Sequence, residues 1–153
     1  MTVKITGMNE LNNYIKDVKK FLKAPTKFFA RASQIGQANV LQHFRNEQGP
    51  SGKWQGLSAT TIAMRTKGKG KRKSKGILQD NGDLKRSISG EYSRNSARIG
   101  SAGVGSSYSR IHNFGGMAGR GKKVKIPKRE FLWFDKNSYG QMENAMVSLL
   151  EKA

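Results

Sequence analysis

Two helical patterns, separated by one proline, fill residues 9–45, NELNNYIKDVKKFLKAPTKFFARASQIGQANVLQHFR. Between Asn9 and Leu22 the apolar side chains recur every three or four residues, which predicts an amphipathic helix; they are Leu11, Tyr14, Ile15, Val18, Phe21 and Leu22. Pro25 should end this helix, because a proline holds the residue before it out of the α region. A second helix is predicted from Thr26 to about Arg45. We expect either two antiparallel helices joined at Ala24–Pro25, which would need a further surface to cover them, or one bent helix.

The rest of the chain alternates turns, short strand patterns and short helices. Ser58 is expected to cap a helix that ends near Arg65, and Leu84 and Ile88 to share one helical face. Short β-type segments are expected around residues 91–93 and 97–100, one or two helical turns from Tyr108 to Gly115, and an amphipathic helix over residues 138–152. Helices at both ends with short strands between them predict an α+β domain. It would contain an N-terminal helical pair, a small antiparallel sheet, a C-terminal helix and long basic loops.

Positive charge dominates the composition, with 29 Lys and Arg against 10 Asp and Glu, a net charge of +19. Such a chain is expected to seek a polyanion or an acidic protein. We expect two mobile basic loops, at about residues 65–76 and 119–125, whose glycines suit phosphate contacts without base readout. Solvated loops and contacts with an acidic protein remain open alternatives. The expected contact residues are Lys67, Lys69, Lys71, Arg72, Lys73, Lys75, Arg120, Lys122, Lys123 and Lys125.

Residues that could carry chemistry are few. There is no cysteine, so neither a disulfide nor a thiolate metal site can form. His43 and His112 lack metal-ligand spacing; we expect His43 on a helix surface and His112 in a polar-edged core. Asp80 and Asp83 flank Asn81–Gly82 and are interpreted as turn and cap residues, with a nuclease metal site as a remote alternative. We therefore expect no enzyme, no cofactor and no metal.

Neither a secretory leader nor an apolar run long enough to span a membrane is evident in the sequence. Synthesis in the cytoplasm and no membrane partner are therefore expected.

Four segments in a fixed order resemble the phage virion morphogenesis family, the tail completion proteins of Mu-like and related contractile-tailed phages. They are residues 44–60, 77–88, 108–116 and 126–132, so the resemblance covers about residues 40–134. The motif residues in them are expected to fix turns and to pin loops onto the helices, and none is expected to perform a reaction. They are Pro50, Gly52, Trp54, Leu57, Asp80, Gly82, Leu84, Gly115, Gly116, Pro127 and Phe131.

The resemblance implies one tail-completion-like domain over residues 1–153 and a place in the virion, at the tail or neck. Such a protein would finish the phage tail and help to join it to the head by assembling as a ring, expected to be a hexamer. Its partners would be further copies of itself, other tail and neck proteins, and the phage DNA in the conduit. The alternative is a small basic nucleic-acid-binding protein of ribosomal or nucleoid type. That alternative explains the charge equally well but leaves the ordered motifs unexplained.

Overall fold

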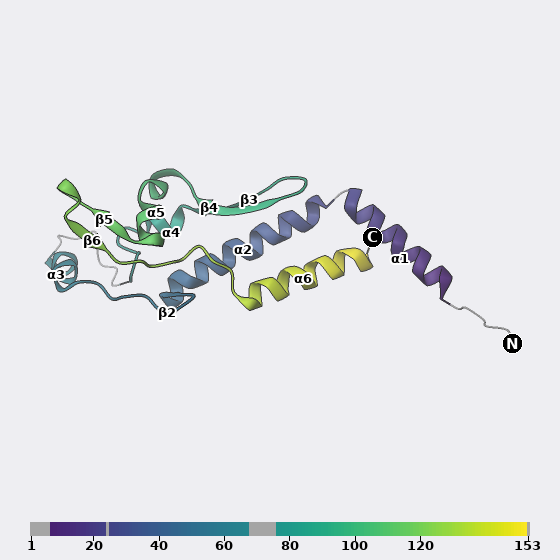
Figure 1. Cartoon of the computed structure of the whole chain (residues 1–153), viewed down its shortest axis with the longest axis horizontal. Coiled ribbons are helices and arrows are strands. Elements are labelled where there is room, and N and C mark those ends of the chain that lie inside the picture. The colour runs from purple at the N-terminus through teal and green to yellow at the C-terminus, as the bar shows by residue number, and fades with distance from the viewer. Residues whose placement is uncertain (1–6, 24, 68–75, 153) are drawn as a thin grey trace.

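The computed structural model describes residues 7–23, 25–67 and 76–152, and it confirms the α+β class (Figure 1). The α-helices are α1 (Met8–Lys23), α2 (Thr26–Asn46), α3 (Ala59–Lys67), α4 (Asp83–Arg86), α5 (Ser106–Phe114) and α6 (Lys136–Glu151). Three antiparallel hairpins pair β1 (Gln48–Gly49) with β2 (Gly52–Lys53), β3 (Ile88–Tyr92) with β4 (Ala97–Ser101), and β5 (Gly116–Ala118) with β6 (Val124–Ile126). Short 3-10 turns cover Gly103–Gly105 and Arg120–Lys122. No helix in these ranges is long and apolar enough to cross a bilayer.

Helix α2 is the centre of the fold, with the β3–β4 hairpin along one side and α6 along the other (Figure 1). Its buried residues include Ile35, Val40 and Phe44. Phe44 is fully buried against Trp54 and Phe131, with ring centroids 5.7 and 5.1 Å away. The core continues through Ile77, Leu84 and Ile88. Residues from four distant parts of the chain therefore share one apolar cluster.

Two glycines let the β3–β4 hairpin lie directly on α2. A Cβ atom on Gly90 would stand 2.8 Å from the carbonyl oxygen of Ser33, and one on Gly36 would stand 2.7 Å from Ile99. The side chain of Gln37 crosses the same interface and donates to the carbonyl of Ile88 at 2.9 Å. Close backbone approach is thus a requirement of this packing.

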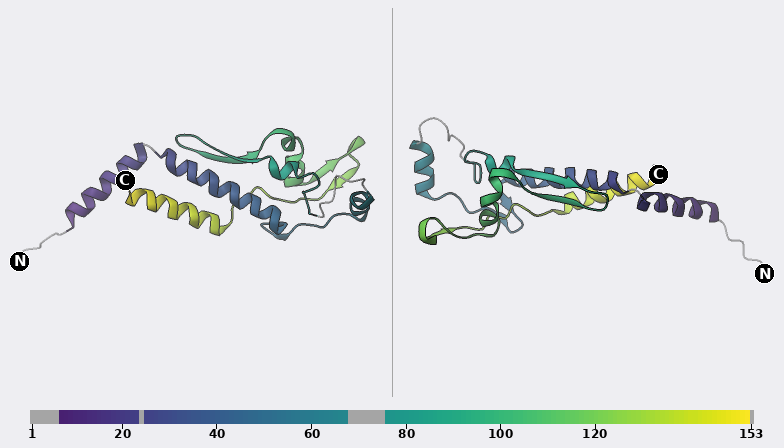
Figure 2. Two further views of the ribbon diagram at one scale, coloured as in Figure 1. Left: turned by 180° about the vertical axis from the view of Figure 1, so that it is seen from behind. Right: turned by 90° about the horizontal axis from the view of Figure 1, so that it is seen from above.

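The expected antiparallel pairing of the two N-terminal helices is wrong. Helix α1 ends at Lys23 and projects past the body of the molecule, as both views of Figure 2 show, whereas α6 occupies the side of α2 on which a hairpin partner would lie. The arrangement is nearer to the bent alternative, although two separate helices replace the single one. The physical reason is that α6 already supplies the apolar surface that α2 needs.

Two further expectations are corrected. Ile88 does not continue the helical face of Leu84; it is buried as the first residue of β3, because α4 ends at Arg86. Of residues 119–125, all expected as a loop, residues 119–123 do connect β5 to β6, whereas Val124 and Lys125 belong to β6, where Lys125 pairs with Met117. Most of the other basic loop, residues 68–75, lies outside the described part of the chain.

Candidate assembly surfaces

The first motif folds as a tight hairpin that carries a buried tryptophan. Pro50 lies in the turn between β1 and β2, and Gly52 takes a φ of 117°, which favours glycine. Trp54 follows, 7% exposed, and its Nε1 donates to the carbonyl of Glu130 at 3.1 Å. Leu57 packs on the edge of the same core. The hairpin is thereby tied to the segment that contains the fourth motif.

The second motif turns the chain into α4. Gly82 has a φ of 78° and occupies the cap position itself, so Asp83 is the first helical residue and pairs with Arg86. Asp80 lies 3.5 Å from Nε of Arg65 in α3. Leu84 then enters the core at 3% exposure. The carboxylates therefore serve the turn and its ion pairs, although the expected capping role of Asp83 falls to Gly82.

The third and fourth motifs are joined by a buried asparagine that sequence reasoning missed. The side-chain oxygen of Asn113 in α5 accepts hydrogen bonds from the backbone N–H groups of Phe131 and Leu132, both at 3.0 Å. Gly115, with a φ of 73°, lies against the backbone of Lys128, where a Cβ would stand 2.9 Å from its nitrogen. Gly116, with a φ of 150°, begins β5, and Phe131 is fully buried. An asparagine beside a glycine pair was the only sequence signal for this link.

A second missed residue is Arg129, which is 7% exposed despite its charge. Its Nε donates to the carbonyl of Gln55 at 2.9 Å and its Nη2 to that of Gly56 at 3.0 Å. The cation thus holds the chain between Trp54 and α3. Burial lowers the pKa of Arg129, and the nearby charge of Arg65 lowers it further.

The histidines lie in different environments from each other. His43, expected on a helix surface, is 1% exposed and stacks on Trp133 with ring centroids 4.3 Å apart, so that expectation is wrong. His112 lies half-buried in α5, against the ring of Tyr108. Burial lowers the pKa of both histidines below the ordinary range, and the charge of Arg129 adds to the effect at His112. Among the described residues, no group of three or more His, Asp or Glu side chains could hold a metal ion.

A groove of about 690 Å³ lies where all four motifs meet. Leu57, Asp80, Gly82, Leu84 and Pro127 all line it, together with side chains from α3, α5 and β6. The structure therefore brings together motif residues that are far apart in the sequence. The other motif residues do not line it; they are Pro50, Gly52, Trp54, Gly115, Gly116 and Phe131.

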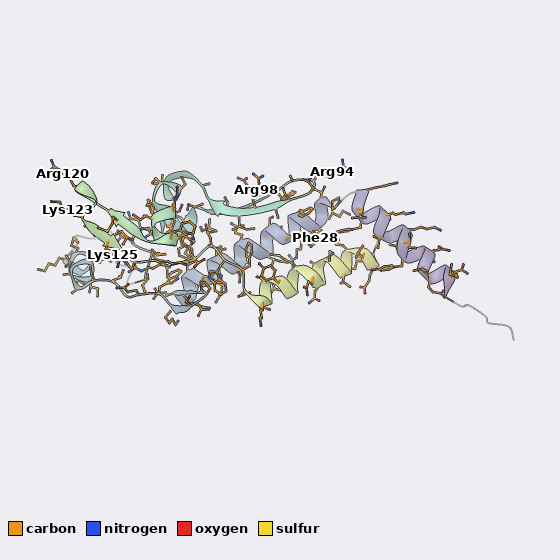
Figure 3. The ribbon with its side chains drawn as sticks, viewed as in Figure 1. Phe28, Arg94, Arg98, Arg120, Lys123 and Lys125 are labelled. Carbon is orange, nitrogen blue, oxygen red and sulfur yellow. The ribbon has the colours of Figure 1, made fainter. Side chains whose placement is uncertain are left out.

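The described members of the two basic segments gather at the end of the molecule opposite α1. Figure 3 shows Arg120, Lys123 and Lys125 on the β5–β6 hairpin, and Lys67 ends α3, whose side chains share the groove with β6. From Gly115 to Arg129 the sequence has no acidic residue. Lys69, Lys71, Arg72, Lys73, Lys75 and the side chain of Lys122 lie outside what the structure describes. We call the set Lys67, Arg120, Lys123 and Lys125 the basic end.

The opposite end presents an uncovered apolar stripe on α1. Although the sequence predicts this stripe as a packing face, none of the α1 residues is buried. Leu11 is 50% exposed, Tyr14 60% and Leu22 67%. Apolar side chains clustered in this way commonly mark an interaction surface.

An apolar helix thus lies at one end of the molecule and the basic end at the other, with a motif-built scaffold between them. The chain matches the phage virion morphogenesis family over residues 9–151 and belongs to that family. It has a structural role in the phage virion.

Among curated proteins, the Mu-like prophage FluMu G protein 2 of Haemophilus influenzae is 49% identical over 55 residues. That alignment covers 36% of this chain and 38% of the relative's own length. No solved structure matches the chain significantly.

Proposed function

We propose that the protein is a tail completion component that finishes the phage tail and helps to join it to the head. The observation that carries the proposal is the separation of two contact surfaces, the apolar stripe of α1 and the basic end, on an elongated scaffold. The proposal is also supported by membership of a virion morphogenesis family and by the similarity of a segment to a Mu-like prophage protein.

The proposed working form is a ring, expected to be hexameric. Head-to-tail contacts between copies of one chain close into rings when the rotation between neighbours allows it. A protein that joins a tail to a head needs one surface for its own copies and another for its neighbours. The two ends of this molecule could divide these tasks, with α1 directed to a further copy.

The basic end is proposed to face the DNA conduit or an acidic neighbour in the neck. Three of its four cations stand on a hairpin with glycines at positions 116, 119 and 121, and no aromatic residue is interleaved with these three. Such a surface suits contacts with phosphate groups and does not provide a platform for base stacking.

Deletion of the gene from a phage or prophage that encodes this chain tests the proposal. We expect electron micrographs of the lysate to show filled heads and full-length tails that are not joined, and a plasmid copy of the gene to restore infectious particles. Joined particles in normal yield without the gene would contradict the proposal. A block in head or tube formation would do so as well.

The net charge of +19 favours one rival, a nucleic-acid-binding protein of ribosomal or nucleoid type. Mass spectrometry of purified virions separates the two functions. The tail proposal expects the chain in the particle at a fixed copy number, whereas the rival expects it with host ribosomes or nucleoid.

A further inference from the structure

The direction of α1 is fixed at its C-terminal end. Phe21 meets Phe28 of α2 edge to face, with ring centroids 6.1 Å apart, and Nη2 of Arg94 on the β3–β4 hairpin donates to the carbonyl of Lys23 at 2.9 Å. Figure 3 shows Phe28 and Arg94 on the two sides of this junction. Helix α1 also contacts α6. These contacts hold α1 outward, so it is not placed to fold back and cover α2.

The apolar stripe of α1 is consequently covered at one part only. Val18 and Phe21 are half-buried, whereas Met8, Leu11 and Tyr14 are each at least half exposed. A helix of 16 residues with no buried side chain is marginal in water, because most helical stability in proteins comes from packing of the apolar face. No other part of the described chain covers the rest of the stripe, so the stripe is suited to packing on a partner.

We infer that the stripe of α1 packs on the outward face of α6 in a second copy of this chain. This inference deepens the proposed function, on whose ring it rests. The outward face of α6 carries Met146 and Val147, 36% and 49% exposed, with Tyr139 two turns earlier on the same side. Both helices have 16 residues and are about 24 Å long, so they are equal in length.

Charge favours α6 of a neighbour over a second α1. At 100° per residue, Lys19 borders one edge of the α1 stripe and Lys23 and Lys16 follow further round on that side, whereas Glu10 and Asp17 lie beyond the other edge. The exposed side of α6 presents Glu143 and Glu151, and neither carboxylate has an ion-pair partner in the described part of the chain. A symmetric α1–α1 contact through this edge would bring the lysines together, at a repulsive cost. An α1–α6 contact joins two different surfaces and is therefore of the kind that closes rings.

The absence of cysteine in the chain makes a cross-linking test direct. Two single variants, Leu11→Cys and Val147→Cys, are purified separately, mixed and oxidised, so that any mixed disulfide must join two copies. We expect a mixed dimer in high yield. The matched control mixes Leu11→Cys with Met117→Cys, which is 49% exposed like Val147 but lies on the β5–β6 hairpin, and it should give at least about tenfold less mixed dimer.

Predominant Leu11→Cys homodimers would overturn the inference in favour of a symmetric α1 pair. Equal yields with Val147→Cys and Met117→Cys would overturn it as non-specific contact. No disulfide between copies, together with capture of Leu11→Cys by another virion protein in the particle, would overturn it in favour of a foreign partner.

A charge-reversal series provides the second measurement. We expect Lys16→Glu, Lys19→Glu and Lys23→Glu together to raise the concentration for half assembly at least about tenfold in light scattering, and Glu143→Lys with Glu151→Lys to weaken assembly in the same direction. Mixing the two variants should restore assembly, because opposite charges then meet again. The corresponding reversal of Arg120, Lys123 and Lys125 is the control and should leave assembly unchanged. Failure of the mixture to recover would contradict the α1–α6 pairing.

Failure of the α1–α6 interface can be distinguished from failure of the proposed function. A mixed disulfide in purified protein supports the interface even if deletion phages join heads to tails normally. If deletion leaves heads and tails unjoined but no mixed disulfide forms, the results support the proposed function and contradict the α1–α6 interface.

Discussion

Single buried polar side chains hold the long connections of this protein in place. Asn113, 3% exposed, replaces a strand partner for the backbone of residues 131–132, and Arg129 does the same for the carbonyls of residues 55–56. Buried backbone groups must be paired, and among the described residues these segments have no sheet neighbour to pair them. Much of the specificity of the fold therefore depends on two residues that no periodic pattern marks.

Asn113→Ala tests this role. The change leaves the N–H groups of Phe131 and Leu132 without an acceptor in the core, and we expect the free energy of unfolding to fall by about 3 kcal/mol. Urea denaturation followed by tryptophan fluorescence measures it. Asn12→Ala, on the exposed side of α1, is the control and should change stability by less than about 0.5 kcal/mol. Equal effects of the two substitutions would contradict the proposed role of Asn113.

Because of its two histidines, the protein is expected to be less stable in mild acid. Burial lowers the pKa of His43 and His112 in the folded protein, whereas in the unfolded chain each has its ordinary pKa of about 6.5. Below that value the unfolded state binds more protons than the folded state, so the free energy of unfolding decreases as the pH falls. The pKa of Asp135 is also lowered, since hydrogen bonds from Ser138 and Asn39 outweigh the opposing effect of burial, so its contribution is lost only at more acid pH.

Urea denaturation at about pH 7.5 and about pH 5.5 measures this dependence, and we expect the lower value at the lower pH. NMR titration of the two imidazoles in the folded protein provides the control, with both pKa values expected below 6.5. Imidazole pKa values above 6.5, or greater stability in acid, would contradict the prediction.

Among the elements, α2 organises the fold and the β3–β4 hairpin depends on it. A two-stranded hairpin is marginally stable alone, so its packing on α2 is what stabilises it. The five residue pairs of its register place Gly90 opposite Ile99, and Gly90 is the position where the hairpin backbone approaches Ser33.

Two substitutions in this hairpin are expected to differ sharply. Gly90→Ala introduces a Cβ 2.8 Å from the Ser33 carbonyl oxygen and should destabilise the protein by about 1–3 kcal/mol through overpacking. Gly100→Ala, on the partner strand, has no atom within 4 Å of the new methyl group and should be neutral or slightly stabilising. Thermal unfolding of both variants is the measurement. A Gly90→Ala protein as stable as Gly100→Ala would show that the hairpin can move away from α2.

Across the whole molecule, α3 and the β5–β6 hairpin, which carry the basic end, lie at the opposite end of an elongated body from α1, which carries the apolar stripe (Figure 1). Cations also occur on α1, so a net charge of +19 alone does not locate a polyanion surface. The charged side chains of the β5–β6 hairpin are all cationic, whereas the lysines of α1 lie on the same helix as Glu10 and Asp17.

DNA binding should therefore depend on which cations are removed. Neutralising Arg120, Lys123 and Lys125 to glutamine is expected to weaken duplex DNA binding and to reduce the salt slope by up to about 0.9 for each phosphate that the protein no longer neutralises. Filter binding across salt concentrations is the measurement. The control neutralises Lys16, Lys19 and Lys23, an equal change in charge, and should have a smaller effect. Equal effects would assign binding to net charge, and an unchanged salt slope on neutralising Lys69 to Lys75 would remove that segment from DNA contact.

Local sequence was sufficient wherever local forces decide the structure. The bounds of α2 to within one residue and of α6 to within two, the cap at Ser58, the stop at Gly115 and the two strands near residues 91 and 99 were predicted, because periodicity, prolines, glycines and caps act within a few residues. The absence of thiolate chemistry also follows from composition.

Long-range contacts decided the rest. His43 is buried because it stacks on Trp133, 90 residues away, and α1 lies outward because α6 packs along α2 in its place. Ile88 begins a strand because Ser101 pairs with it, and Asn113 became part of the site because residues 131–132 pass beside it. These outcomes depend on which surfaces meet after the chain has folded, and no pattern within a short window contains that information.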